Sequence, residues 1–237
     1  MIEFLGDVAA WFTDPENWSG VNGIPNRMWE HIQMSAFALV VAAAVALPIA
    51  VWLGHHRRGG QVAVATVNIG RAIPSFAIVA LARPITIRLG LGLGFWPTFL
   101  ALFVLAIPPM FANAYIGVRN VDPALVEAGR GMGMTDRELL RKVEVPMASP
   151  VILAAVRVAA VQVVATATLG ALVAWGGLGR YIIDGFATQN NVMVFAGGLL
   201  VALLAIVTEL VLGRVENLVV PKGIQRTDAD EVHKAAA

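Results

Sequence analysis

The chain has 237 residues, of which 58% are hydrophobic and only 14% are charged, and its mean hydropathy is +0.73. Soluble domains carry roughly a quarter charged residues, so this composition excludes an ordinary soluble domain and indicates a bilayer environment. The formal net charge of +1 is uninformative as a total, and the lack of cysteine excludes disulfides and thiolate metal sites.

The first 30 residues mix acids, aromatic residues, asparagine and glycine. They lack the basic segment and apolar core that mark a cleaved signal peptide. We expect residues 1–30 to be an extracytoplasmic segment. Its tryptophans either anchor it at the membrane interface or belong to a short helix on the outer surface.

Five later stretches are apolar and long enough to cross a hydrocarbon core of about 30 Å as helices. A membrane barrel would instead need short alternating strands. The sequence therefore predicts an all-α integral membrane protein with a transmembrane domain over residues 31–214 and a cytoplasmic tail over residues 215–237. The expected spans are residues 32–53, 62–82, 95–118, 151–173 and 192–212.

The basic residues are distributed unevenly among the connections between these spans. If the N-terminus lies outside the cell, most of the 17 lysines and arginines fall on the inner side. Inner loops of membrane proteins carry an excess of such residues. We therefore expect the N-terminus outside and the C-terminus in the cytoplasm.

The longest inner connection, residues 119–148, begins with the pattern of a capped helix. Asp122 can accept hydrogen bonds from free N–H groups of the first turn, and the proline that follows suits that turn. Three glycines between residues 129 and 133 mark the end of this helix.

A second helix start follows at once, because Thr135 and Glu138 have the spacing of a capping box. We expect Pro146 to end this helix before Ser149 and Pro150 open the fourth span. Two short helices at the inner face suit the groove of a soluble partner, or they form an amphipathic element resting on lipid headgroups. The residues alone leave both interpretations open.

This connection resembles the cytoplasmic "EAA" loop of ABC importer permeases. The family pattern reads E-A-A, three residues, G, nine residues, I, one residue, L-P. Here glycine stands at the third position and valine at both aliphatic positions. The matching residues are Glu127, Ala128, Gly129, Gly133, Val143, Val145 and Pro146.

Four further segments resemble permeases that take up osmoprotectants such as glycine betaine, carnitine and choline. They are residues 68–76, 121–128, 131–135 and 175–185. Permeases for amino acids or another small solute share the loop and the glycine-rich segment, so they remain an alternative. An ion-coupled secondary carrier is a further alternative, although such carriers use acids along the path and repeated halves.

The resemblance implies the type I ABC importer permease (MetI-like) fold with a cytoplasmic coupling helix, in the bacterial inner membrane. It implies a second permease subunit, same or homologous, cytoplasmic ATPase subunits that bind ATP and Mg, and an extracytoplasmic substrate-binding protein. It implies no nucleic acid partner and no catalysis by this chain. The chain also lacks the Gly-Lys dipeptide that a P-loop requires.

In that family the loop acts as a lever gripped by the ATPase. The resemblance implies that Glu127 fixes its register, that Gly133 allows its sharp bend and that Pro146 sets the start of the fourth span. The residues expected to form the ATPase-coupling loop are Asp122, Glu127, Ala128, Gly129, Gly133, Thr135, Glu138, Val143 and Pro146.

Ionisable residues inside membrane spans face the protein interior or water. Arg71, Arg157 and Glu209 are such residues. Glu209 either pairs with one of the two arginines to hold helices together, or an arginine lines the path and meets a substrate carboxylate. Histidine spacing gives no metal site, and we expect none.

Pro74 interrupts the second span and produces either a packing kink or a gating bend. The glycines after the fourth span form either a flexible loop or an outer gate or docking rim for the binding protein. The candidate path or gate residues are Arg71, Pro74, Ser75, Gly176, Gly177 and Gly179.

Overall fold

The computed structural model describes residues 1–57, 60–70 and 72–220. Arg71 and residues 221–237, most of the expected cytoplasmic tail, lie outside the described residues. Within them the regular structure is entirely helical. Four helical runs are long and apolar enough to cross a membrane: α2 (Ile24–His56), α5 (Phe95–Arg119), the continuous run Asp136–Val173 and α10 (Asn191–Val219).

The helices α3 (Gly60–Gly70) and α4 (Ser75–Arg88) form a bent pair, in which Val62–Gly70 and Ser75–Arg88 meet at 78°. The pair is either a fifth, broken span or a re-entrant loop. The run Asp136–Val173 contains α7, a π-helical turn η2, α8 and a 3-10 segment η3. The remaining bounds are α1 (Ile2–Thr13), η1 (Pro15–Trp18), α6 (Pro123–Gly131), α7 (Asp136–Leu139), η2 (Leu140–Glu144), α8 (Val145–Thr166), η3 (Ala167–Val173) and α9 (Gly179–Ala187).

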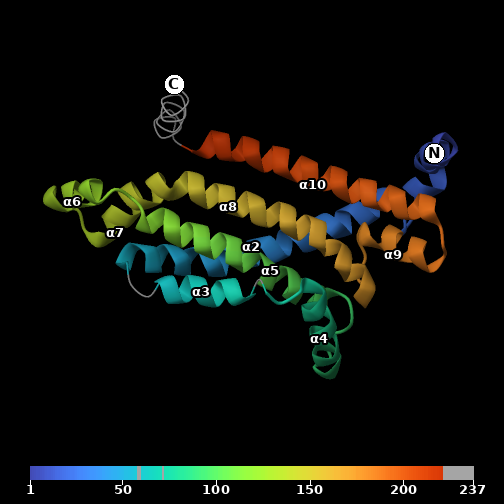
Figure 1. Ribbon diagram of the computed structural model, residues 1–237, viewed down its shortest axis with the longest axis horizontal. Helices are drawn as coiled ribbons and strands as arrows, with labels where there is room; N and C mark the ends of the chain where they lie inside the picture. The colour runs from blue at the N-terminus through green and yellow to red at the C-terminus, as the bar shows by residue number, and fades with distance from the viewer. Residues whose placement is uncertain (58–59, 71, 221–237) are drawn as a thin grey trace.

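The long helices lie side by side, α3 lies along them and α4 projects away from them (Figure 1). The N-terminal helix α1 and helix α9 lie at one end, on the right of the view. Helices α6 and α7 lie at the opposite end. The loop with the EAA pattern is therefore separated from the N-terminus by the full length of the bundle.

A ridge of small residues on α2 packs α2 closely against α5. It consists of Ala38, Ala42, Ala46, Ala50 and Gly54, spaced four residues apart. The four alanines are at most 2% exposed. A Cβ at Gly54 would lie 3.0 Å from the Tyr115 carbonyl oxygen. Because lipid tails are as apolar as leucine, helix association in membranes depends on such close contacts between small residues.

Two helices differ in extent from the expected apolar spans. Helix α2 begins at Ile24 rather than at residue 32, because Pro25 suits its first turn and Arg27 and Glu30 are held by polar contacts described below. Its start therefore lies inside the segment 1–30 that we expected to precede the membrane domain. The second span is not one helix with a kink, since α4 starts afresh after Pro74.

Pro146 does not end the second helix of the loop. The chain stays helical from Asp136 to Val173, through the π-helical turn Leu140–Glu144. In this wider turn the Val145 N–H donates to the Leu140 carbonyl. Pro146 follows in the first turn of α8, and a residue without an N–H is readily accommodated where the hydrogen-bond ladder shifts register.

Candidate functional site: coupling element and membrane cleft

Helix α6 is capped at both ends. The Asp122 carboxylate accepts a 2.8 Å hydrogen bond from the Ala124 N–H, as the sequence predicts. At the other end Gly133 has a φ of +82°. The Met134 N–H donates to the Gly129 carbonyl at 3.1 Å, and the Gly133 N–H donates to the Arg130 carbonyl at 2.9 Å. This pair of bonds is a Schellman motif, and it makes the bend after α6 a defined turn.

The predicted capping box starts the next helix. The Glu138 N–H donates to the Thr135 hydroxyl at 3.3 Å, and the Thr135 N–H donates to the Glu138 carboxylate at 3.2 Å. Lys142 forms an ion pair with Glu138 at 2.9 Å. Each of these contacts joins residues at most four positions apart.

Gly129, where the family pattern has alanine, lies directly beneath Leu139. Leu139 is fully buried, and its Cδ1 lies 2.7 Å from where a Cβ of residue 129 would stand. Because residue 129 has no side chain, Leu139 can pack against the backbone of α6. Val121, Val126 and Leu139 form a small core between α6 and α7. Within it, Met134 and Val143 are half-buried.

The base of this element is tied to the first span. Glu144, in the π-helical turn, is 3% exposed and contacts His55 in the last turn of α2. Sequence reasoning missed this contact, because the two residues are distant in the chain. The "coupling element", residues 122–146, is therefore held at its core, at its caps and at its base.

The outer face of the coupling element is open. Glu127 and Ala128 are exposed, as are the apolar side chains of Leu125 and Met132, which are 43% and 73% exposed. Within the described residues, the Glu127 side chain makes no hydrogen bond or ion pair. It lies on the rim of a depression of about 370 Å³ that Glu144 also lines.

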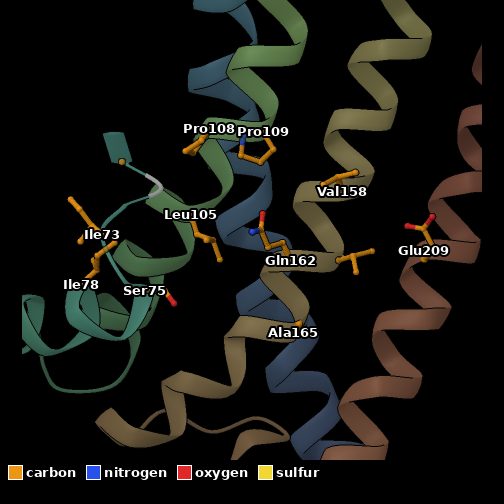
Figure 2. A pocket seen from close by; sticks show the side chains of 12 residues that line it. Ile73, Ser75, Ile78, Leu105, Pro108, Pro109, Val158, Gln162, Ala165 and Glu209 are labelled. Atoms are coloured by element: carbon orange, nitrogen blue, oxygen red, sulfur yellow. The ribbon is translucent and has the colours of Figure 1, made fainter. Parts of the chain in front are cut away.

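A second feature is a cleft of about 530 Å³ between α3, α4, α5, α8 and α10. Ser75, Gln162 and Glu209 supply its polar groups. In Figure 2, Ser75 and Glu209 lie on opposite sides of Gln162. The other lining residues are Gly70, Ile73, Ile78, Leu105, Pro108, Pro109, Val158, Val161 and Ala165.

Glu209 pairs with Arg157, one of the two arginines proposed from the sequence. Their Oε1 and Nη1 atoms lie 3.3 Å apart. Arg157 Nε also lies 3.4 Å from Glu216 Oε2, a partner that sequence reasoning missed. A Cβ at Gly213 would lie 3.2 Å from Arg157 Nη1. The spacing of Glu209, Gly213 and Glu216 along one helix face is the signal that could have identified this site.

The glycines after the fourth span, Gly176, Gly177 and Gly179, are packed tightly against α2 and η3 and do not form a flexible loop. The Gly177 N–H donates to Glu30 Oε2 at 2.8 Å, and Arg27 pairs with the same carboxylate at 2.8 Å. A Cβ at Gly176 would collide with Glu30, and one at Gly179 would collide with the Thr168 backbone. None of the three glycines lines the cleft that contains Ser75, so the predicted path residues fall into two separate places.

Sequence reasoning also missed two residues near these glycines, His31 and Tyr181. His31 is 1% exposed, and its Nε2 lies 2.8 Å from the Val164 carbonyl oxygen. The Tyr181 hydroxyl donates to the Asn22 carbonyl at 2.6 Å. Burial raises the pKa of Tyr181 to about 12, with a smaller contribution from Glu30 and an opposing one from Arg27. The phenol therefore stays protonated and keeps this hydrogen bond at physiological pH.

Among the described residues, no group of three or more histidine or acidic side chains could hold a metal ion. The apolar spans, the broken helix and the capped element at one end of the bundle define a polytopic membrane protein of the transport permease class. Residues 46–220 match the family model of the binding-protein-dependent transport system inner membrane component. The chain belongs to this family, as its resemblance to ABC importer permeases predicts.

Curated relatives include the carnitine transport permease protein OpuCB of Listeria monocytogenes, which is 38% identical over 84% of this chain and 89% of the relative. The choline transport system permease protein OpuBB of Bacillus subtilis (strain 168) is 37% identical over 84% of this chain and 90% of the relative. The osmoprotectant import permease protein OsmW of Salmonella typhimurium (strain LT2) is 33% identical over 83% and 92%.

The fold is similar to that of a solved ABC transporter. An inward-facing structure of the MetNI methionine ABC transporter matches with a TM-score of 0.72 and 25% identity, over 81% of this chain and 94% of the other. A second crystal form matches with a TM-score of 0.75 and 23% identity, over 88% of this chain and 100% of the other. The predicted MetI-like fold is therefore confirmed.

Proposed function

We propose that this chain is the permease subunit of an ATP-driven, binding-protein-dependent importer for osmoprotectants such as glycine betaine, choline or carnitine. The names of its curated relatives support this substrate class. Import of amino acids or another small solute by the same fold is the alternative that the uptake experiment below decides.

The observation that carries the proposal is the construction of the coupling element. It is stiff, because α6 is capped at both ends and its base is continuous with the fourth span. Its free face combines the exposed Glu127 with the exposed apolar residues Leu125 and Met132. Buried apolar anchors beside a charged group are typical of a protein interface.

We propose that this free face occupies a groove on a cytoplasmic ATPase subunit, which binds ATP and Mg. Glu127 has no partner within the described residues, so it is available to the ATPase. Movement of the ATPase is then transmitted to α8 without a flexible joint, because the π-helical turn keeps the helix continuous past Pro146. A second permease subunit completes the path, and a binding protein delivers solute at the outer end.

In this proposal the N-terminus lies outside the cell and the C-terminus in the cytoplasm. The bias of basic residues toward one side supports this orientation. So does the position of α1 and α9 at the end of the bundle opposite to the coupling element (Figure 1).

The proposal is tested by co-expressing the tagged chain with candidate ATPase subunits from its own operon and isolating the complex. We expect an ATPase to co-purify, and we expect Glu127→Lys to reduce its recovery at least fivefold. Glu16→Lys reverses an exposed charge at the far end of the molecule and serves as the control. Complexes that never contain an ATPase would overturn the proposal.

The substrate class is tested with the complex and its binding protein in proteoliposomes. We expect ATP-dependent uptake of choline, glycine betaine or carnitine. Uptake of an amino acid, with none of the three quaternary ammonium solutes, would replace the osmoprotectant assignment by the alternative.

A further inference from the structure

The cleft between the spans has one charged residue among the lining residues that the structure describes. Glu209 lines it, and 46% of the Glu209 side chain is exposed. Glu216, which contacts the same arginine, does not line the cleft and is only 20% exposed. Of the two carboxylates, that of Glu209 is therefore the one accessible from the cleft.

Among the described residues, the ion-pair cluster of Arg157, Glu209 and Glu216 has an excess of one negative charge. Arg157 lies between Glu209 and Glu216, at 3.3 and 3.4 Å, so two carboxylates surround one guanidinium. The guanidinium is held against Gly213 on α10, and Arg157 is not itself a lining residue of the cleft. The group that a solute would meet is therefore the carboxylate of Glu209.

The remaining walls suit a methylated cation. A quaternary ammonium group has no N–H to donate and presents methyl groups, so apolar walls with one nearby carboxylate match it better than a ring of hydrogen-bonding groups. Most of the lining side chains are aliphatic or proline. Binding sites for small molecules typically combine such walls with a few placed polar groups.

The two other polar residues lie away from Glu209. In Figure 2, Gln162 from α8 lies between Glu209 and Ser75, which comes from α4. An amide and a hydroxyl can both donate hydrogen bonds to oxygen. Glycine betaine and carnitine carry a carboxylate, and choline carries a hydroxyl, at a distance from the ammonium group.

We propose that Glu209 binds the quaternary ammonium group of the transported solute in this cleft, with Gln162 and Ser75 donating to the oxygen-bearing end. Arg157 is a positioning residue that orients the Glu209 carboxylate. The inference rests on the proposed osmoprotectant function for the identity of the solute. The charge of the cleft is tested separately from transport.

The lack of native cysteine makes a direct test possible. Val158→Cys places a thiol at an exposed position of the cleft wall. In the full chain with its ATPase in nanodiscs, this thiol is modified by a trimethylammonium-ethyl or a sulfonatoethyl methanethiosulfonate. We expect the ratio of the two modification rates to favour the cation, and to fall by about fivefold on Glu209→Gln, since one carboxylate acts oppositely on the two reagents.

Two variants separate a binding role from a packing role. Glu216→Gln removes the other carboxylate on Arg157, and we expect it to change the ratio less than twofold. Glu209→Asp keeps the charge and should restore the ratio. An unchanged ratio in Glu209→Gln, or an equal fall in both glutamine variants, would overturn the inference.

Uptake supplies the second readout. In proteoliposomes with the binding protein, we expect Glu209→Gln to lower choline uptake at least tenfold and to raise the ATP hydrolysed per choline imported. Glu216→Gln should retain more than half of wild-type uptake. Equal losses of uptake in both variants would overturn the inference. If the wild type imports no quaternary ammonium solute while the rate ratio behaves as expected, the cation site stands and the osmoprotectant function falls.

Discussion

His55 Nδ1, on the last turn of α2, lies 2.5 Å from Glu144 Oε2 in the π-helical turn beneath the coupling element. Both side chains are at most 8% exposed. The contact joins the last turn of α2 to the base of the coupling element. A force applied to the coupling element therefore reaches two spans together.

This contact leads to a prediction about coupling. Glu144→Ala leaves the buried His55 without its partner, and we expect a loss of stability of about 2 kcal/mol. The ATP hydrolysed per solute imported should rise, because the lever is released from α2. Thermal unfolding of the purified complex and paired ATPase and uptake assays measure the two effects.

The double variant His55→Leu with Glu144→Leu is the control. Replacing both polar groups by apolar ones leaves no unpaired group, so stability should recover relative to the single variant. If the single and double variants are equally stable, the two residues do not interact as described.

The bend after α6 gives a second prediction. Gly133 has a left-handed φ of +82°, which costs a residue with a Cβ about 1 kcal/mol. We expect Gly133→Ala to weaken recovery of the ATPase severalfold by disturbing the Schellman turn. Hydrogen exchange at the Met134 amide, which donates across this turn, reports the local opening.

Gly131 is the matched control for this bend. It is the last residue of α6, and a Cβ there would meet no other atom within 4 Å. Gly131→Ala should keep the ATPase bound and slow exchange slightly, because alanine is the better helix former. Equal loss of ATPase in both variants would contradict a specific role for the turn.

The orientation of the chain gives a third prediction, which again uses the cysteine-free background. Met132→Cys and Val21→Cys introduce thiols at positions that are 73% and 74% exposed. In intact cells we expect a membrane-impermeant maleimide to label the cysteine at position 21 and to leave the one at position 132 unmodified until the cells are opened. The reverse pattern would invert the topology and place the coupling element outside.

The packed glycines at the outer end give a fourth prediction. A methyl group at Gly176 would displace Glu30 and remove the hydrogen bond from the Gly177 N–H. We expect Gly176→Ala to destabilise the protein by about 2 kcal/mol and to increase hydrogen exchange at the Gly177 amide. Gly198→Ala on α10, where a Cβ meets nothing within 4 Å, should be neutral or stabilising. If Gly176→Ala leaves the stability unchanged, the contact between Glu30 and the Gly177 N–H does not depend on a glycine at position 176.

Much of the coupling element could be predicted from the sequence. The Asp122 cap, the Thr135–Glu138 box and the bend at Gly133 depend on residues within about four positions of each other, and local hydrogen bonding decides them. The ridge from Ala38 to Gly54 was missed, although its spacing of four residues is visible in the chain.

The cleft was predicted only in part. Glu209 and Arg157 were identified as a possible pair from their isolated charges in apolar spans. Glu216 was not identified, and the outer glycines were grouped with Ser75 although they lie elsewhere. Which charged groups meet depends on the rotation and crossing of helices, and the spans' hydrophobic pattern does not specify it.

The sequence by itself determined that this chain is a helical membrane permease with a capped loop before its fourth span, because span length and end caps are local properties of the chain. Only the tertiary structure decided how the loop is attached. His55 and Glu144 are 89 residues apart, and Glu30 and Gly177 are 147 apart. Such contacts arise only when packed helices bring their ends together.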